Sequence, residues 1–454
     1  MNKHEARPIL GKEIKTLLVL MLPIVVSQLA QIGITVTDTI MAGRHSEVSL
    51  AGVAVGSSLW VPCFLFLMGV LMATTPIIAH AWGAENSNDI KHSMQQSVWL
   101  AIAIGLIMML ITQILRFGFD WMSMENETRI QAKGYLYAVS FGLPALAMFQ
   151  VLRGLNEGAH LTRPYMYVSL FALLLNIPLN YIFIYGKFGL PEMGGVGCGW
   201  ATTVVLYIEC LIMLVMTLSN KTFAHIPWQR AWSKPQWEKI SEILKLGIPI
   251  GFSLLIEASM FSLIALFLAQ LGSTVVAGHQ VAMSFASFLF MVPLSMSLAL
   301  TIRCGFMLGK GHAHHARYIG YLGLAVTLGT ATLGSSIILL FADQIAALYT
   351  TDESVRLLAV ELLFFAAIFQ FSDGLQVATA GILRGYKDTR FAFYVVLTAY
   401  WLIGLPLGYS LSLTDIWAPA MGAQGFWVGM IAGLSFAAVL LIGRFLFITM
   451  RLKI

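Results

Sequence analysis

The chain has 454 residues, of which 58% are hydrophobic and only 11% are charged, and its mean hydropathy is +0.81. A soluble domain contains about 25% charged residues, so this composition excludes a soluble protein and indicates a polytopic membrane protein. The net charge of +5 does not indicate nucleic-acid binding, because the basic residues lie in the loops between apolar segments.

Twelve apolar segments are long enough to cross a bilayer, which requires about 20 mainly apolar residues. In chain order, spans are expected at residues 16–43, 50–81, 93–115, 131–154, 164–186, 196–219, 241–270, 275–308, 318–341, 356–382, 391–412 and 423–449. The connections are short apart from a polar segment at 220–240. The predicted fold is therefore all-α, with twelve transmembrane helices.

The second half of the chain repeats the first at a shift of 226 to 228 residues. Pairs in register include Pro23 with Pro249, Ser27 with Ser253, Gly52 with Gly278, Gly158 with Gly385, Arg163 with Arg390 and Pro178 with Pro406. We therefore predict an N-lobe at residues 1–219, a cytoplasmic linker at 220–240 and a C-lobe at 241–454. Two copies of a membrane unit are typical of transporters in which a cavity lies between two halves that rock against each other.

The distribution of basic residues predicts the orientation in the membrane. Most of the 27 Lys and Arg residues fall on one side, whereas the other side holds only Arg44, Arg116, Arg129, Lys133, Lys187 and Arg356. Cytoplasmic loops carry the excess of Lys and Arg, so both termini are expected in the cytoplasm. Six spans per repeat give both lobes the same topology, so the two six-helix lobes should be parallel.

Glu257 and Asp373 are the most informative ionisable residues inside the predicted spans. Glu257 lies about 18 Å along its helix from the cytoplasmic Lys245, and Asp373 lies about 16 Å from the cytoplasmic Arg384. Both carboxylates should therefore lie near the midplane, with no Lys or Arg partner at that depth. Intramembrane carboxylates are costly and usually functional, so we predict that this pair binds a cation or a proton. Helix-packing hydrogen bonds are the other interpretation.

A second polar group is predicted in the N-lobe. Asp38 stands in the run T-V-T-D-T, whose threonines offer hydroxyls, and Asn176 and Asn180 lie one turn apart on either side of Pro178. Pro178 also frees a backbone carbonyl one turn earlier. Carboxylate, amide and carbonyl oxygens are ligands that hard cations prefer. A cation site and a helix-packing network are both consistent with this pattern.

The carboxylates do not follow the repeat. At the repeat shift, Glu257 aligns with Gln31, Asp38 with Ile264 and Asp373 with Leu146. Each lobe therefore has its own polar residues, which suggests distinct roles. Glu209 and Glu361 also fall in spans, and the sequence assigns neither of them a role.

The motifs that the chain lacks narrow its function. It has no G-x-x-x-x-G-K-S/T loop for ATP, no H-E-x-x-H and no G-x-S-x-G, so a secondary transporter is favoured over an ATP-driven pump or an intramembrane enzyme. A channel is a further alternative. Two lobes around a midplane carboxylate pair fit alternating access better than a filter loop or a ring.

Several motifs resemble those of the multidrug and toxic compound extrusion (MATE) transporters. They are L-R-G-Y-K-D-T-R at 383–390, G-G-V-G-C-G at 194–199 and N-I-P-L-N-Y-I-F-I-Y-G at 176–186. I-E at 256–257 and S-D at 372–373 stand where the NorM-type branch places its carboxylates. The resemblance covers roughly residues 10–450.

The resemblance implies a cation-coupled antiporter that exports lipophilic or cationic drugs and dyes, with sodium ion or proton as the coupling ion and no other cofactor. It implies a C-lobe cation site, with sodium at Glu257 and Asp373, and an N-lobe site at Asp38, Asn176 and Asn180, with Cys198 near the cation path. Asp38, Glu257, Asp373 and Phe369 are the expected substrate-binding residues. Phe369 stands where NorM relatives often have a tyrosine, so one coordinating hydroxyl is missing.

The resemblance also implies a multi-pass protein of the bacterial inner membrane that confers antibiotic resistance. We expect a monomer whose partners are drugs and membrane lipid, without nucleic acid. A flippase for lipid-linked oligosaccharides is the alternative within the same superfamily. Such proteins usually have a basic cavity for a pyrophosphate group, whereas the midplane predicted here is acidic.

Overall fold

The computed structural model describes residues 10–227, 232–416 and 419–451, and within these ranges the chain is helical and contains no β-strand. Residues 228–231 of the predicted linker lie outside the described residues. Among the described residues, eleven helical segments are long and apolar enough to cross a membrane, and a bent pair, Asn126–Ser140 and Leu143–Gly158, makes a twelfth when it is taken as one span. This number confirms the all-α fold with twelve predicted spans.

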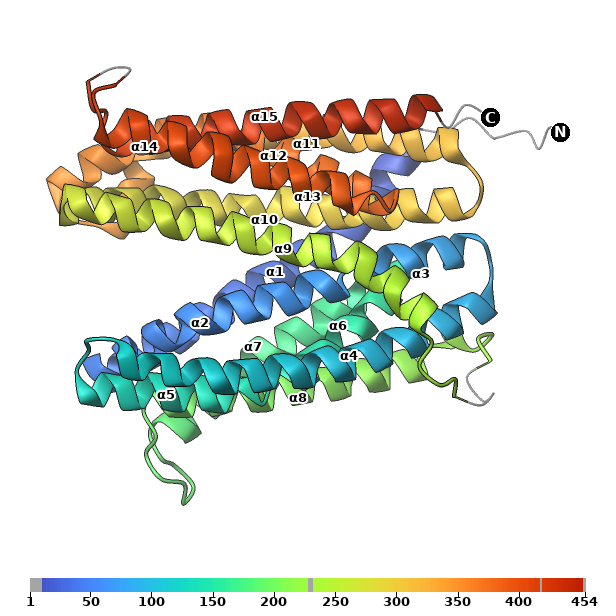
Figure 1. The fold of residues 1–454 in the computed structure, drawn as a ribbon, viewed down its shortest axis with the longest axis horizontal. Coiled ribbons are helices and arrows are strands. Elements are labelled where there is room, and N and C mark those ends of the chain that lie inside the picture. Colours follow the sequence, from blue (N-terminus) through green and yellow to red (C-terminus); the bar gives the residue numbers. More distant parts are fainter. Residues whose placement is uncertain (1–9, 228–231, 417–418, 452–454) are drawn as a thin grey trace. The chain divides into compact units, whose positions relative to one another are not determined.

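The described chain forms two compact units. Unit 2 comprises Leu22–Gly251. It contains most of α1 (Leu10–His45), then α2 (Glu47–Leu71), α3 (Thr74–Gly83), α4 (Ser87–Leu115), η1 (Arg116–Trp121), α5 (Asn126–Ser140), α6 (Leu143–Gly158), α7 (Arg163–Ile184), α8 (Gly195–Ser219), η2 (Lys221–Phe223) and the first half of α9 (Trp237–Leu268). Helix α5 packs along α2 and α8, and α6 packs against α3, α4 and α8 (Figure 1).

Unit 1 comprises Phe252–Ile454 together with the segment up to Met21. Its elements are the second half of α9, η3 (Ala269–Leu271), α10 (Ser273–Gly309), α11 (Ala313–Tyr349), α12 (Glu353–Gly385), α13 (Thr389–Leu397), the π-helix η4 (Thr398–Gly404), α14 (Leu405–Leu413) and α15 (Ala423–Arg451). Helix α12 packs along α10, α11 and α15 (Figure 1).

Both unit boundaries fall inside helices. The first lies between Met21 and Leu22 in α1, and the second lies between Gly251 and Phe252 in α9. Each is within two residues of a proline that the repeat places in register, Pro23 in α1 and Pro249 in α9. A proline inside a helix removes a backbone hydrogen bond and favours a kink. Each of these two helices therefore contributes one segment to each unit.

The helices differ from the predicted spans mainly at their ends. Helix α11 runs from Ala313 to Tyr349, whereas its apolar run predicted 318–341. The backbone is non-helical at Phe341, where the predicted span ends, and a second helical segment continues from this kink to Tyr349. The span predicted at 131–154 is bent by 43° between α5 and α6. Pro144 at the start of α6 accounts for this break, because it has no N–H to continue the helix.

Candidate functional site

The three predicted polar residues of the N-lobe lie together in unit 2. The side-chain amide of Asn176 donates to Asp38 Oδ1 at 3.0 Å, and the amide of Asn180 donates to the same oxygen at 2.6 Å. The Asn180 amide also donates to Asn176 Oδ1 at 3.0 Å. Both asparagines are completely buried in α7, one helical turn apart. The Asp38 group is therefore a hydrogen-bonded cluster that joins α1 to α7.

The threonine hydroxyls that were expected to surround Asp38 form hydrogen bonds elsewhere. The hydroxyls of Thr35, Thr37 and Thr39 donate to carbonyls one turn earlier in α1, rather than to Asp38. Cys198 is completely buried in α8, and its side chain interacts with Asp38. The Asn180 Oδ1 atom is buried and has no hydrogen-bond partner among the described residues. This oxygen is available to a cation that binds beside Asp38.

The second predicted group lies inside unit 1. Asp373 on α12 is 2% exposed, Glu257 on α9 is partly buried, and the two carboxylates lie close enough to interact electrostatically. Phe369, one turn before Asp373, is 3% exposed and its ring lies edge-on to Trp427 at 5.8 Å. Phe369 is thus part of the packing around the carboxylates in this conformation.

A basic residue also acts on this pair, although within the described residues it forms no ion pair with either carboxylate. Arg384 is only 8% exposed, and its guanidinium interacts electrostatically with Glu257. Its Nη2 donates to Ser297 Oγ of α10 at 2.6 Å. Arg384 lies in the last turn of α12, where its position in the sequence puts it, and its side chain is buried there. The polar group of unit 1 therefore contains two acids and one base.

Tyr400 is a member of this group that the sequence analysis missed. It lies in the π-helix η4, is 1% exposed, and interacts electrostatically with both Glu257 and Asp373. Its hydroxyl has no hydrogen-bond partner among the described residues. Tyr400 thus brings to the carboxylates the kind of group that Phe369 lacks. Gly404 and Pro406, which follow it, were the available signal, because prolines and π-helices often mark functional breaks in a helix.

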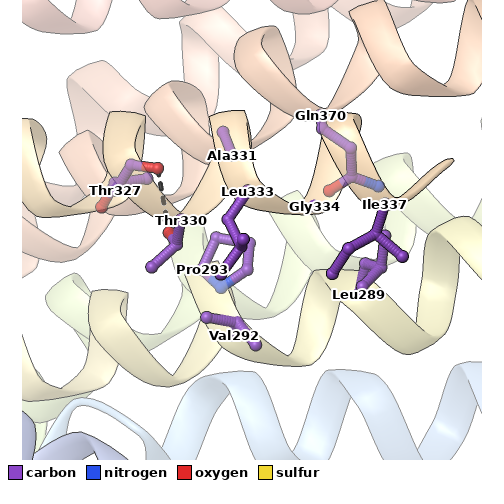
Figure 2. A pocket seen from close by; sticks show the side chains of 10 residues that line it. All are labelled: Leu289, Val292, Pro293, Thr327, Thr330, Ala331, Leu333, Gly334, Ile337 and Gln370. Carbon is purple, nitrogen blue, oxygen red and sulfur yellow. Dashed lines mark hydrogen bonds between the residues drawn. The ribbon is translucent and has the colours of Figure 1, made fainter. Parts of the chain in front are cut away.

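Figure 2 shows a pocket of about 200 Å³ between α10 and α11, with Gln370 of α12 at one end. Leu289, Val292 and Pro293 line one side, and Thr327, Thr330 and Leu333 line the other. The Gln370 amide donates to the Ala286 carbonyl at 3.5 Å. The lining carries no charged side chain, so the pocket suits an apolar group and does not provide a cation site.

Two further observations limit the site chemistry. Within the described residues, His, Cys, Asp and Glu side chains nowhere form a group of three or more that could hold a metal ion. Any sodium site must therefore combine a carboxylate or two with neutral oxygens. Glu361 is exposed and accepts a hydrogen bond from Gln424 at 2.5 Å, which separates it from both polar groups of the interior.

A model of the MatE family matches residues 23–182 and 249–410, one stretch in each half of the chain. The chain is 42% identical over 432 residues to the multidrug resistance protein MdtK of Yersinia enterocolitica, covering 94% of each chain. It is 44% identical over 438 residues to the probable multidrug resistance protein NorM of Shewanella oneidensis, covering 96% of this chain and 95% of the relative.

Solved structures share the same fold. An outward-facing conformation of a multidrug resistance MATE family transporter gives a TM-score of 0.88 at 20% identity, covering 97% of each chain. The eukaryotic MATE transporter AtDTX14 gives a TM-score of 0.85 at 20% identity, covering 96% of each chain. Both similarities extend over nearly the whole length of the chain.

Proposed function

Because the chain belongs to the MatE family, a family of transporters rather than enzymes, we propose that it exports lipophilic and cationic drugs and dyes in exchange for sodium ions. The NorM and MdtK relatives are named as multidrug resistance proteins, which supports drug export. Their bacterial sources support a place in the inner membrane, and the excess of Lys and Arg on one side of the predicted spans supports both termini in the cytoplasm. We further propose a monomer in membrane lipid that does not bind nucleic acid and confers antibiotic resistance.

The observation that carries the coupling proposal is the group formed by Glu257, Asp373 and Tyr400. Two carboxylates and a free hydroxyl inside a membrane protein need a proton or a cation, and Arg384 offsets one of the two negative charges. With one base for two acids, a single sodium ion or proton would neutralise the group. The hydroxyl of Tyr400 favours sodium, which requires several oxygen ligands, over a proton, which requires one.

The mechanism that we propose is alternating access between an N-lobe, residues 1–219, and a C-lobe, residues 241–454, joined by the linker at 220–240. Sodium would bind from the outside at Glu257 and Asp373, with a second cation site at Asp38, Asn176, Asn180 and Cys198. To drive export, the cation must bind one conformation more tightly than the other. Asp38, Glu257 and Asp373 would attract a cationic drug when the cation leaves, and Phe369 would contribute an aromatic surface.

Efflux of ethidium from membrane vesicles, with a sodium gradient and a proton gradient imposed separately, tests this proposal. We expect efflux that requires sodium in the wild type and is lost in Asp373→Asn. Glu361→Gln, a carboxylate outside both interior groups, is the matched control and should keep efflux. Efflux driven only by the proton gradient would show that the proton, and not sodium, is the coupling ion. Absence of efflux under both gradients, with normal expression, would reject drug export and favour the flippase alternative.

A further inference from the structure

Glu209 is a buried carboxylate that takes no part in either polar group described above. It lies in the middle of α8 and is 4% exposed. Its Oε1 accepts one hydrogen bond, from the Gln31 amide of α1, at the long limit of 3.5 Å. Ionised carboxylates are costly inside a membrane unless they are paired and well hydrogen-bonded. Its surroundings therefore decide whether Glu209 has a chemical role.

The positive charge that reaches Glu209 belongs to Arg153 of α6, and it is already bound elsewhere. Arg153 Nε donates to Glu157 Oε1 at 2.6 Å, and its guanidinium carbon lies 3.8 Å from the centroid of the Tyr165 ring. Arg153 also interacts electrostatically with Glu209 without replacing its ion pair with Glu157. One guanidinium thus serves two carboxylates, Glu157 and Glu209.

With both carboxylates ionised, this group has one excess negative charge inside the membrane. The Cys210 thiol and Tyr165, whose hydroxyl donates to Gln28 at 3.2 Å, also interact electrostatically with Glu209. A hard cation needs several oxygen ligands around the carboxylate, whereas Gln31, which is hydrogen-bonded to Glu209, presents its amide nitrogen; a proton needs only the carboxylate itself.

The repeat argues against a purely structural role for this carboxylate. Ala437 stands at the repeat-equivalent position in α15, so the packing of the corresponding helix needs no carboxyl group there. The presence of Glu209 is a feature of one lobe only.

We propose that Glu209 is a proton-binding site of unit 2, separate from Asp38. The charges of Arg153 and Glu157 determine how readily Glu209 binds and releases this proton. A role in transport rests on the proposed drug export: Glu209 then binds and releases its proton during each transport cycle. The neutral form would keep the Gln31 hydrogen bond, and the ionised form would be stabilised by the remaining field of Arg153.

Infrared difference spectroscopy of the purified protein tests proton binding without transport. Spectra would be recorded from about pH 5 to about pH 9, a range that brackets most perturbed carboxyl groups. We expect a carboxylic-acid band that disappears as the pH rises in the wild type and in Glu361→Gln, and that is absent from Glu209→Gln. Glu209→Asp should restore a titrating band if Gln at this position disturbs folding. Identical spectra for wild type and Glu209→Gln would overturn the proposal.

The pH dependence of tetraphenylphosphonium binding tests whether this proton belongs to the transport cycle. Drug binding that displaces one proton changes the Kd by up to tenfold per pH unit. Glu209→Gln should lose this share of the pH dependence, whereas Glu361→Gln, which changes an exposed carboxylate outside the interior polar groups, should keep it. An unchanged slope in Glu209→Gln would overturn the link to transport. If the wild type neither binds nor exports the probe, drug export is rejected, and the infrared titration still decides whether Glu209 binds a proton.

Discussion

Tyr400 and Asp373 are both buried in the interior of unit 1, and the phenol interacts electrostatically with the carboxylates of Glu257 and Asp373. The Tyr400 hydroxyl is buried and has no hydrogen-bond partner among the described residues. Leaving a buried hydroxyl unpaired costs about 1–3 kcal/mol, so the unpaired Tyr400 hydroxyl lowers the stability of the fold. An ion or proton that enters between Asp373 and Glu257 would give this hydroxyl a partner.

We therefore predict that Tyr400→Phe raises the sodium concentration needed for half-maximal efflux about ten- to hundredfold, because a hydrogen bond or ligand to a charged group contributes about 1.5–3 kcal/mol. The measurement is the sodium concentration that gives half-maximal ethidium efflux in vesicles. Tyr394→Phe is the matched control, since Tyr394 lies on the preceding helix α13 and is 63% exposed. Equal sodium dependence in Tyr400→Phe and wild type would remove this hydroxyl from the site.

For the second polar group, we predict that Asp38→Asn keeps the fold but lowers efflux at least tenfold. The substitution preserves the shape of the side chain and removes the charge that accepts from Asn176 and Asn180. A cluster that served only to pack α1 against α7 would tolerate this change, whereas a cation site would not. The measurements are ethidium efflux and thermal unfolding in detergent. Thr39→Val, which alters an exposed hydroxyl bonded within α1, should match the wild type in both.

Much of the fold was predictable because a bilayer imposes length and apolarity on every span. The boundaries at which the chain divides into two units were not predictable from the sequence. These boundaries, at Met21 and Gly251, depend on which long-range contacts each half of α1 and α9 makes. Hydropathy carries no such information, although Pro23 and Pro249 mark the places where the two helices pass from one unit to the other.

The same contrast holds for the polar groups. Asp38 and Asp373 were identifiable because a carboxylate inside an apolar run is rare. Tyr400 and Arg384 were missed because Tyr and Arg are common at the membrane interface, and only packing turns them inward. Tyr400, 1% exposed, lies in the π-helix η4, for which Gly404 and Pro406 are only a weak signal. Arg384, 8% exposed, donates to Ser297 of α10, a contact that the sequence does not indicate.

Close packing of α9 against α2 gives a prediction for stability. A Cβ atom at Gly247 would collide with the backbone of Val70, whereas a Cβ at Gly329 in α11 would meet no atom within 4 Å. Gly247→Ala should therefore destabilise the protein by about 1–3 kcal/mol through overpacking, and Gly329→Ala should be neutral or slightly stabilising because alanine favours a helix. Thermal unfolding of the detergent-solubilised variants measures both effects. Equal unfolding temperatures for the two variants would contradict the close crossing.

The start of α12 gives a prediction for pH. Asp352 lies in the loop before this helix and accepts hydrogen bonds from the Ser354 side chain and from the backbone N–H groups of Ser354 and Val355. These bonds lower the pKa of Asp352, the Ser354 hydroxyl most of all. The cap is therefore intact above the ordinary pKa of aspartate and is lost as the pH falls through the lowered value. Hydrogen exchange of the first turn of α12 should speed up in acid beyond the intrinsic rate change, and Asp352→Asn should lack this response.

Glu13 fastens the first segment of α1 to the rest of unit 1. It is 3% exposed and accepts from Arg303 Nε at 3.0 Å and Nη2 at 2.8 Å, while His315 Nε2 lies 3.0 Å from the same carboxylate. Removing one partner of a buried ion pair leaves an uncompensated charge and costs about 3–5 kcal/mol. Glu13→Ala should therefore lower the thermal stability of the protein strongly.

A double-mutant cycle distinguishes the ion pair from simple loss of contacts around Glu13. Glu13→Gln with Arg303→Gln should recover part of the stability that Glu13→Gln alone loses, because no unpaired charge remains buried. Asp343→Asn, which breaks the exposed pair of Asp343 with Arg356, should stay close to the wild type because solvent screens that pair. Additive losses in the Glu13 and Arg303 variants would show that the two side chains are not coupled, and that α1 is held to unit 1 by its apolar contacts.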